Sequence, residues 1–278
     1  MPVRVVTDSS CDLPDELVDQ LGIEIVPLTI RFGSEELIDR KELSAAEFWR
    51  RLESSPTLPE TAAPSAGAFE TAFRGLVADG ADGIICINLS SKLSATMQSA
   101  QVAATSLADT CPVAVVDSLT VSMGVGSLAV SAAQQAAAGA TLDAIVADIT
   151  SQRDRTKLFA TLDTLEYLRK GGRIGAAQAM FGSMLSIKPV IELRNGIVEE
   201  AGKVRTRSKA LRTLADHVGR QPVERLAVLH GAAPDLDELL ELVQPYVPRD
   251  EIIVGTVGPV IGTHAGPRVI GVSFLTTT

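Results

Sequence analysis

The first half of the chain alternates between short apolar runs and longer segments in which apolar residues recur every three or four positions. Short β-branched runs predict buried strands, and the longer pattern predicts amphipathic helices. We expect strands over residues 3–8, 23–32, 83–89 and 112–118. We expect helices over 12–22, from Ser44 through Leu52, from Ser65 through Leu76 and from about Ser94 to Leu107, then two alanine-rich helices to about Asp154. Strands that alternate with helices favour a parallel sheet with right-handed crossovers.

The second half has a different pattern, with its strongest local signal over residues 187–206. There Asn195-Gly196 separates two alternating runs, as a type I′ β-hairpin requires. We expect further strands over 157–163, 223–231, 251–257 and 269–276, and helices over 164–172, 176–187, 208–219 and 235–244. The fold class is therefore α/β, with an N-terminal parallel-sheet domain over 1–155 and a C-terminal α/β domain over 156–278 whose mixed sheet contains the hairpin.

Composition and charge narrow the function classes. The 278 residues carry a net charge of −9 and only 4% aromatic side chains, so neither the basic surface nor the stacking platforms of a nucleic-acid-binding protein are expected. Cys11, Cys86 and Cys111 lie far apart with no CxxC pair, which excludes a disulfide framework and a zinc knuckle and suits the cytoplasm. The uncharged segment 118–142 has membrane length, but its many small and polar residues predict a helix packed inside the protein.

Hydroxyl side chains follow several predicted strands, where ligands of open α/β sheets bind. Ser90, Ser91, Ser94 and Thr96 gather at a predicted helix N-terminus, which favours a small-anion or carboxylate site. The same residue types are also ordinary helix caps and turn residues. Among the three histidines, His264 is the strongest candidate, because it lies in a predicted loop between Gly262 and Gly266.

Three motifs of nucleotide-binding and hydrolytic proteins are absent or misplaced. The sequence has no GxxxxGK[ST] loop and no GxSxG nucleophile elbow. Gly124 and Gly126 imitate part of a dinucleotide-binding motif but lie inside a helical pattern. We therefore expect no cofactor and no metal site.

Seven segments, taken in order, resemble those of the DegV family, the fatty-acid-binding subunits of bacterial fatty acid kinase. They are TDSS (7–10), PETAAPSAGAF (59–69), SSKLSATMQSA (90–100), LDTLEYLRKGGRI (162–174), SIKPVIELRNG (186–196), GKVRTR (202–207) and VGPVIGTHAGP (257–267). The resemblance extends over residues 7–267 and so covers nearly the whole chain.

The resemblance implies a two-domain protein that holds one long-chain fatty acid between its domains. Such a protein is not catalytic alone. It presents the carboxylate to a partner kinase subunit of the DhaL type, which phosphorylates it with ATP to an acyl phosphate. By motif, Thr61 and Ser94 would bind the carboxylate, with His264 close by and Arg173 supporting the head group; Arg205 and Arg207 match the basic segment that docks the kinase.

Three positions depart from the family pattern. Ala62 stands where serine is usual after Thr61, Ala95 replaces the glycine of Leu-Ser-Gly-Thr, and Arg268 replaces the glycine of the usual Gly-Pro-Gly. These changes affect the details of head-group binding more than the class of ligand, because Thr61, Ser94 and His264 are present.

The apolar stripe of the segment 176–187 is a candidate lining for the fatty-acid tail. It contains Met180, Phe181, Met184 and Leu185, and flexible methionines suit a tail of variable shape, although such a stripe also fits an ordinary core.

Two other functions stay open. One is a serine hydrolase or acyltransferase that uses Ser94 and His264, although no acid that would orient the histidine is evident. The other is a sensor of small anions.

Overall fold

The computed structural model of the chain describes residues 3–183 and 187–277. Its N-terminal part contains a four-stranded sheet in which all neighbouring strands are parallel. In sheet order the strands are β2 (Glu24–Val26), β1 (Val3–Asp8), β6 (Gly83–Asn88) and β7 (Val113–Asp117). The parallel sheet predicted from the alternating pattern is confirmed.

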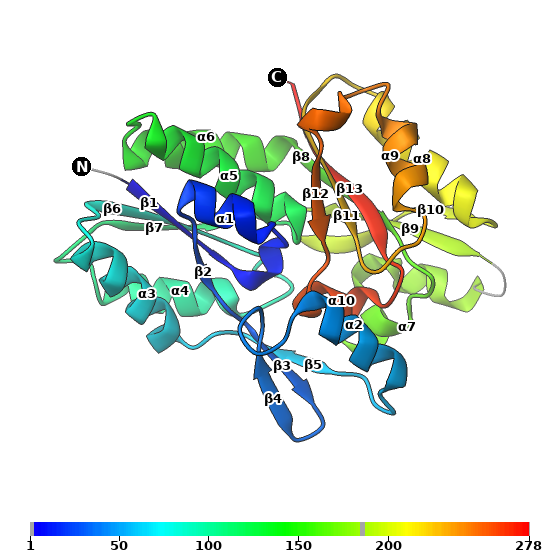
Figure 1. Cartoon of the computed structure of the whole chain (residues 1–278), viewed down its shortest axis with the longest axis horizontal. Helices are drawn as coiled ribbons and strands as arrows, with labels where there is room; N and C mark the ends of the chain where they lie inside the picture. The colour runs from blue at the N-terminus through cyan, green and yellow to red at the C-terminus, as the bar shows by residue number, and fades with distance from the viewer. Residues whose placement is uncertain (1–2, 184–186, 278) are drawn as a thin grey trace.

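Helices cover both faces of this sheet, with α3 and α4 on one side and α5 and α6 on the other (Figure 1). The helices of this part are α1 (Asp15–Leu21), α2 (Ala45–Ser54), α3 (Ala66–Ala78), α4 (Thr96–Thr105), α5 (Met123–Ala137) and α6 (Leu142–Arg155); η1 (Ser9–Cys11) is a short 3-10 turn. The uncharged segment 118–142 contains α5, which is buried from Met123 to Ala133 as predicted. A Cβ at Gly126 would meet the carbonyl oxygen of Cys11 at 2.7 Å, so α5 packs close to the backbone of η1.

The predicted strand over 23–32 is wrong in its extent, because two separate strands replace it. β2 ends at Val26, and β3 (Thr29–Phe32) belongs to a small antiparallel sheet with β4 (Glu35–Ile38) and β5 (Glu60–Ala62). Pro27 has no N–H to donate, and the backbone of Leu28 bonds to Ser9 Oγ and to the Asp39 N–H instead of to a strand. This small sheet projects below the two larger ones in Figure 1.

The C-terminal part contains a six-stranded mixed sheet, as predicted. In sheet order its strands are β10 (Ile197–Val204), β9 (Lys188–Arg194), β8 (Thr156–Thr161), β13 (Ile270–Thr276), β11 (Val223–His230) and β12 (Ile253–Thr256). Asn195 and Gly196 have φ angles of 51° and 82°, which are those of a type I′ turn, and Ile197 pairs with Arg194 across it. The chain passes from one sheet to the other between α6 and β8. The division into domains at residues 155 and 156 stays a proposal.

The two faces of the six-stranded sheet belong to two different cores. The outer face packs against α8 (Arg207–Gly219) and α9 (Leu236–Val243) through residues such as Val228 and Phe274. The inner face, which includes Leu158 and Ile191, belongs to a core shared with the N-terminal part. Because side chains alternate along a strand, one strand serves both cores.

Two segments differ from their predicted conformation. His264 lies in the short helix α10 (Pro259–Ala265) and not in a loop, because Pro259 occupies its first turn, where a missing N–H costs nothing. The segment predicted as a helix over 176–187 forms a 3-10 helix over Gly175–Ser183, preceded by α7 (Glu166–Lys170). A further 3-10 turn, η3 (Arg249–Glu251), precedes β12.

Candidate functional site

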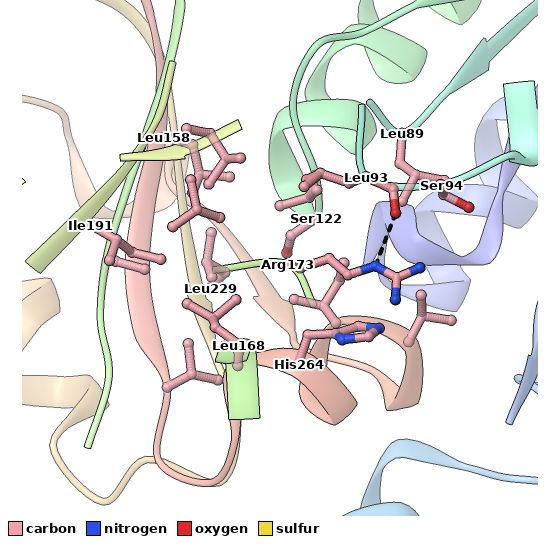
Figure 2. A pocket seen from close by; sticks show the side chains of 18 of the residues that line it. Leu89, Leu93, Ser94, Ser122, Leu158, Leu168, Arg173, Ile191, Leu229 and His264 are labelled. Carbon is pink, nitrogen blue, oxygen red and sulfur yellow. Dashed lines mark hydrogen bonds between the residues drawn. The ribbon is translucent and has the colours of Figure 1, made fainter. Parts of the chain in front are cut away.

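A cavity lies between the inner face of the six-stranded sheet and the N-terminal part. The sheet contributes apolar side chains at alternate positions of its strands: Leu158, Ala160, Ile191, Leu193, Val198 and Leu229. Opposite them lie Leu28, Leu89, Leu93 and Val121 of the N-terminal part. Figure 2 shows that the polar side chains Ser94, Ser122, Arg173 and His264 gather at one side of the cavity, away from Leu158 and Ile191. The cavity is therefore apolar with one polar end.

The helix α10 holds His264 at this polar end. Its start is fixed by two hydrogen bonds from the N-terminal part: Trp49 Nε1 donates to the carbonyl of Val257 at 3.0 Å, and the Gly258 N–H donates to Asp12 Oδ1 at 2.9 Å. Gly262 brings the helix against Phe48 and Trp49, where a Cβ would overlap both rings. His264 is thus placed by contacts that cross between the two parts of the molecule.

The imidazole of His264 is hydrogen-bonded to Thr61, 203 residues away in the sequence. His264 Nε2 lies 2.9 Å from Thr61 Oγ1. Burial, and then the positive charge of Arg173, lower the pKa of His264 to about 4, so the ring is neutral at pH 7. If Nε2 carries the hydrogen, the ring donates to Thr61 Oγ1 and leaves the threonine hydroxyl free to donate to a ligand carboxylate.

Arg173 connects the two walls of the polar end. Its Nε donates to the carbonyl of Leu93 at 3.1 Å, a bond drawn in Figure 2, and its Nη1 donates to the carbonyl of Gly171 at 2.6 Å. The Gly-Gly pair that precedes it ends α7, and Gly172 has a φ of 70°, which glycine adopts without strain. The side chain of Arg173 therefore carries a positive charge to the polar end from a position fixed at both walls.

Ser94 reaches the cavity from the loop before α4, but its serine neighbours do not. Ser94 Oγ lies 2.9 Å from Thr96 Oγ1 and also accepts from the Thr96 N–H. Ser90 Oγ donates to the carbonyl of Gly196 at 2.7 Å, and Ser91 Oγ donates to Asp117. The predicted hydroxyl cluster is therefore divided, and of its members only Ser94 lines the cavity.

The hydrolase interpretation finds no support in this geometry. A nucleophilic serine needs a hydrogen bond to its histidine, and the histidine needs an orienting acid. In the described part of the chain, the hydrogen bond of His264 Nε2 is to Thr61 and that of Ser94 Oγ is to Thr96. His264 Nδ1 is buried without a hydrogen-bond partner among the described residues.

A buried carboxyl group, Asp12, ties the cavity wall to the start of α10. Its Oδ2 accepts from Ser122 Oγ at 2.5 Å, and its Oδ1 accepts from the Gly258 N–H. Burial raises the pKa of Asp12 to about 7, although both hydrogen bonds lower it in part. Ser122 lines the cavity and was not among the predicted site residues, because no motif distinguishes it from the other serines of its segment.

The residues predicted to line the tail cavity and to dock the kinase do not all have the surroundings that the prediction gave them. Met180 is fully buried but does not line the cavity, while Met184, Leu185 and the side chain of Phe181 lie outside the described residues. Arg205 is exposed after β10. Arg207 is largely buried, because it forms an ion pair with Asp235 at 2.5 Å and donates to the carbonyl of Arg268 at 2.7 Å. Arg207 therefore has a structural contact that the basic segment alone did not reveal.

Residues 3–183 and 187–277 contain no group of three or more His, Cys, Asp or Glu side chains arranged to hold a metal ion. None of the helices within those ranges is long and apolar enough to cross a membrane.

Solved structures share this fold over their full length. A fatty-acid-binding DegV family protein from Thermus thermophilus has a TM-score of 0.92 and 32% identity, with all of both chains covered. DegV from Bacillus subtilis, described as a fatty acid binding protein, has a TM-score of 0.87 and 28% identity, again with all of both chains covered.

Sequence comparisons agree with the structural ones. A DegV domain-containing protein of Streptomyces coelicolor is 40% identical over 276 residues, which is 97% of each chain. Another, from Listeria innocua, is 34% identical over 277 residues, or 98% of each chain. The family model described as "Uncharacterised protein, DegV family" matches residues 2–277. Matched over nearly its whole length by this family model and by relatives of 34–40% identity, the chain belongs to the DegV family.

Proposed function

We propose that this protein binds one long-chain fatty acid in the cavity, with the tail along the apolar walls and the carboxylate at the polar end. The observation that carries the proposal is the shape of the site: an apolar cavity ends at a neutral histidine, a guanidinium and the hydroxyl groups of Thr61, Ser94 and Ser122. The solved relatives from Thermus thermophilus and Bacillus subtilis, which are described as binding fatty acids, support the same class of ligand.

The polar end suits a carboxylate. Thr61 and Ser94 would donate hydroxyl hydrogen bonds, His264 would orient Thr61, and Arg173 would supply the compensating positive charge. A hydrogen bond to a charged group contributes about 1.5–3 kcal/mol, and ten buried methylenes contribute about 8 kcal/mol. The tail therefore sets most of the affinity, and the polar residues set the orientation.

We further propose that the protein presents the bound carboxylate to an ATP-dependent kinase subunit of the DhaL type in the cytoplasm. A carboxylate oxygen would attack the γ-phosphorus of ATP, the bond from that phosphorus to the ADP oxygen would break, and acyl phosphate and ADP would leave. This protein would then act as a carrier that is not catalytic alone. The exposed Arg205 is the better candidate for docking the kinase, since Arg207 is held by Asp235.

The test is organic extraction of the protein purified from cells, followed by mass spectrometry of the lipid fraction. We expect a near-stoichiometric long-chain fatty acid. A clean extract, together with no uptake of added palmitate or oleate, would overturn the proposal. Incubation of the loaded protein with ATP, with and without a DhaL-type kinase, then tests presentation: acyl phosphate should form only with the kinase, and Arg205→Glu should slow its formation while leaving fatty-acid binding unchanged.

A further inference from the structure

Ser122, in the cavity wall, has a backbone conformation that a serine adopts only under strain. Its φ and ψ angles are 52° and −138°, a combination that glycine adopts freely and that residues with a Cβ rarely adopt. Ser122 directly precedes α5, where a serine side chain ordinarily accepts a hydrogen bond from the helix backbone, but Ser122 makes no such bond. Because glycine would fit this position without strain, the hydroxyl group of Ser122 has a use other than capping the helix.

The hydrogen of this hydroxyl group is directed to Asp12. Ser122 Oγ donates to Asp12 Oδ2 at 2.5 Å, and both residues are buried. A serine hydroxyl has one hydrogen and two lone pairs. In the described part of the chain, the hydrogen bond of Ser122 Oγ is the one to Asp12, so its lone pairs stay available in the wall of the cavity.

Ser122 lies where the first carbons of an acyl chain would pass. Figure 2 shows Ser122 between Ser94 and Leu158, and all three residues line the cavity. Ser94 is one of the residues proposed to bind the carboxylate, and Leu158 belongs to the apolar wall. A fatty acid that extends from Ser94 toward Leu158 therefore has the carbons next to its carboxylate beside Ser122.

A hydroxyl group is the ligand group that suits Ser122 best. A methylene at this place leaves the lone pairs of Ser122 Oγ unused, and a carboxylate has no hydrogen to give them. A hydroxyl group both donates and accepts. It therefore fits Ser122 when Asp12 is ionised and takes the serine hydrogen, and also when Asp12 is protonated and donates to Ser122 instead.

We propose that Ser122 binds a hydroxyl group of the acyl chain close to the carboxylate, so that the protein selects 2- or 3-hydroxy fatty acids among its ligands. This inference rests on the proposed function. A ligand hydroxyl buried against an apolar wall without a partner weakens binding, and Ser122 offsets that loss. Because Asp12 fixes the Ser122 hydroxyl in one direction, only one enantiomer of the hydroxy acid reaches it.

The test compares hexadecanoic acid with its 2-hydroxy, 3-hydroxy and 16-hydroxy derivatives, with the enantiomers of the first two taken separately. Displacement of a fluorescent fatty acid at pH 8 gives the affinities for the wild type, for Ser122→Ala and for the control Ser34→Ala, an exposed serine between β3 and β4. The quantity compared is the affinity for a hydroxy acid divided by that for hexadecanoic acid, since an effect of the substitution on both ligands cancels in this ratio.

We expect Ser122→Ala to lower this ratio about fivefold for one enantiomer of the 2- or 3-hydroxy acid, as for the loss of one hydrogen bond. The ratio for the 16-hydroxy acid should change less than about twofold, and so should every ratio in Ser34→Ala. Ser122→Gly removes the same hydroxyl group and relieves the backbone strain, so it takes the place of Ser122→Ala if the alanine variant has a lowered unfolding temperature.

Three results would overturn this role of Ser122. They are unchanged ratios for every hydroxy acid in Ser122→Ala, an equal fall for the 16-hydroxy acid, or an equal fall in Ser34→Ala. Failure of the wild type to bind hexadecanoic acid would instead overturn the proposed function, and the selection of hydroxy acids with it.

Discussion

At the scale of single residues, the position of the His264 imidazole depends on the absence of a side chain at Gly171. A Cβ at Gly171 would overlap His264 Nδ1 and lie 3.2 Å from the carbonyl oxygen of Tyr167. The backbone of Gly171, with a φ of −77°, is one that alanine adopts freely. The glycine is therefore required by the imidazole beside it and not by its own conformation.

Gly171→Ala should displace the imidazole from Thr61 and weaken fatty-acid binding at least tenfold. The reason is loss of an oriented hydroxyl donor, since a hydrogen bond to a charged group contributes about 1.5–3 kcal/mol. Isothermal titration calorimetry measures the affinity, and Gly75→Ala is the matched control, because a Cβ at Gly75 meets nothing within 4 Å. Unchanged affinity in Gly171→Ala would contradict this role of His264.

At the scale of elements, Asp12 joins η1 to the start of α10 and to the cavity wall. Its folded-state pKa of about 7 lies above the ordinary value of 3.8, so the folded protein binds this proton more tightly than the unfolded chain does. The stabilisation is fully present below about pH 4 and is lost as the pH rises toward 7. One such group changes the free energy of unfolding by up to about 1.4 kcal/mol per pH unit.

Asp12→Asn should remove this pH dependence, because an amide does not ionise. Urea unfolding at pH 5, 6, 7 and 8 gives the free energy of unfolding of both proteins. We expect the wild-type value minus the variant value to fall between pH 5 and 7 and to level off above that. Asp39, whose pKa burial raises to about 6, is present in both proteins, and its charge contributes to the raised pKa of Asp12. A difference that is constant over this range would show that Asp12 is not the group responsible.

Most elements could be predicted from periodicity, and the exceptions have physical causes. β4 and β5 have four and three residues and were not predicted, since so short a strand shows no alternation. α10 was predicted as a loop because of its glycines and proline, whereas Gly262 is there to allow contact with Phe48 and Trp49. Local pattern indicates elements, but it does not indicate which residue will lie against a glycine.

The candidate site could be predicted in part through the family resemblance. Thr61, Ser94, Arg173 and His264 line one cavity, although up to 203 residues separate them in sequence. The apolar walls and Ser122 were missed because they depend on which strand faces point toward each other across two sheets. Those contacts are a property of tertiary packing, which a single sequence pattern does not contain.

At the scale of the whole molecule, one hydrophobic core spans both parts of the chain. It includes Val5 and Ile87 of the parallel sheet together with Leu158 and Leu229 of the mixed sheet. Ser90 Oγ and Asp12 add hydrogen bonds across the same boundary. The two parts are therefore expected to unfold together.

The single tryptophan reports directly on this boundary. Trp49 donates to the carbonyl of Val257, and a Cβ at Gly231 would meet its ring, so separation of the two parts exposes the indole. In a urea titration of the wild type, tryptophan fluorescence and far-ultraviolet circular dichroism should give coincident midpoints. A fluorescence midpoint well below the dichroism midpoint would mean that the parts separate before either unfolds.

The alternation along β8 divides the residues of one strand between the cavity wall and the core under two helices. Leu158 and Ala160 face the cavity, while Phe159 between them packs into the core under α8 and α9. Substitutions at the even-numbered positions would reshape the space for an acyl chain, and the odd-numbered position that holds the helices would be untouched. Substitutions at Leu158 or Ala160 therefore act on the cavity and on the core shared by the two parts of the chain, and they leave the separate core under α8 and α9 in place.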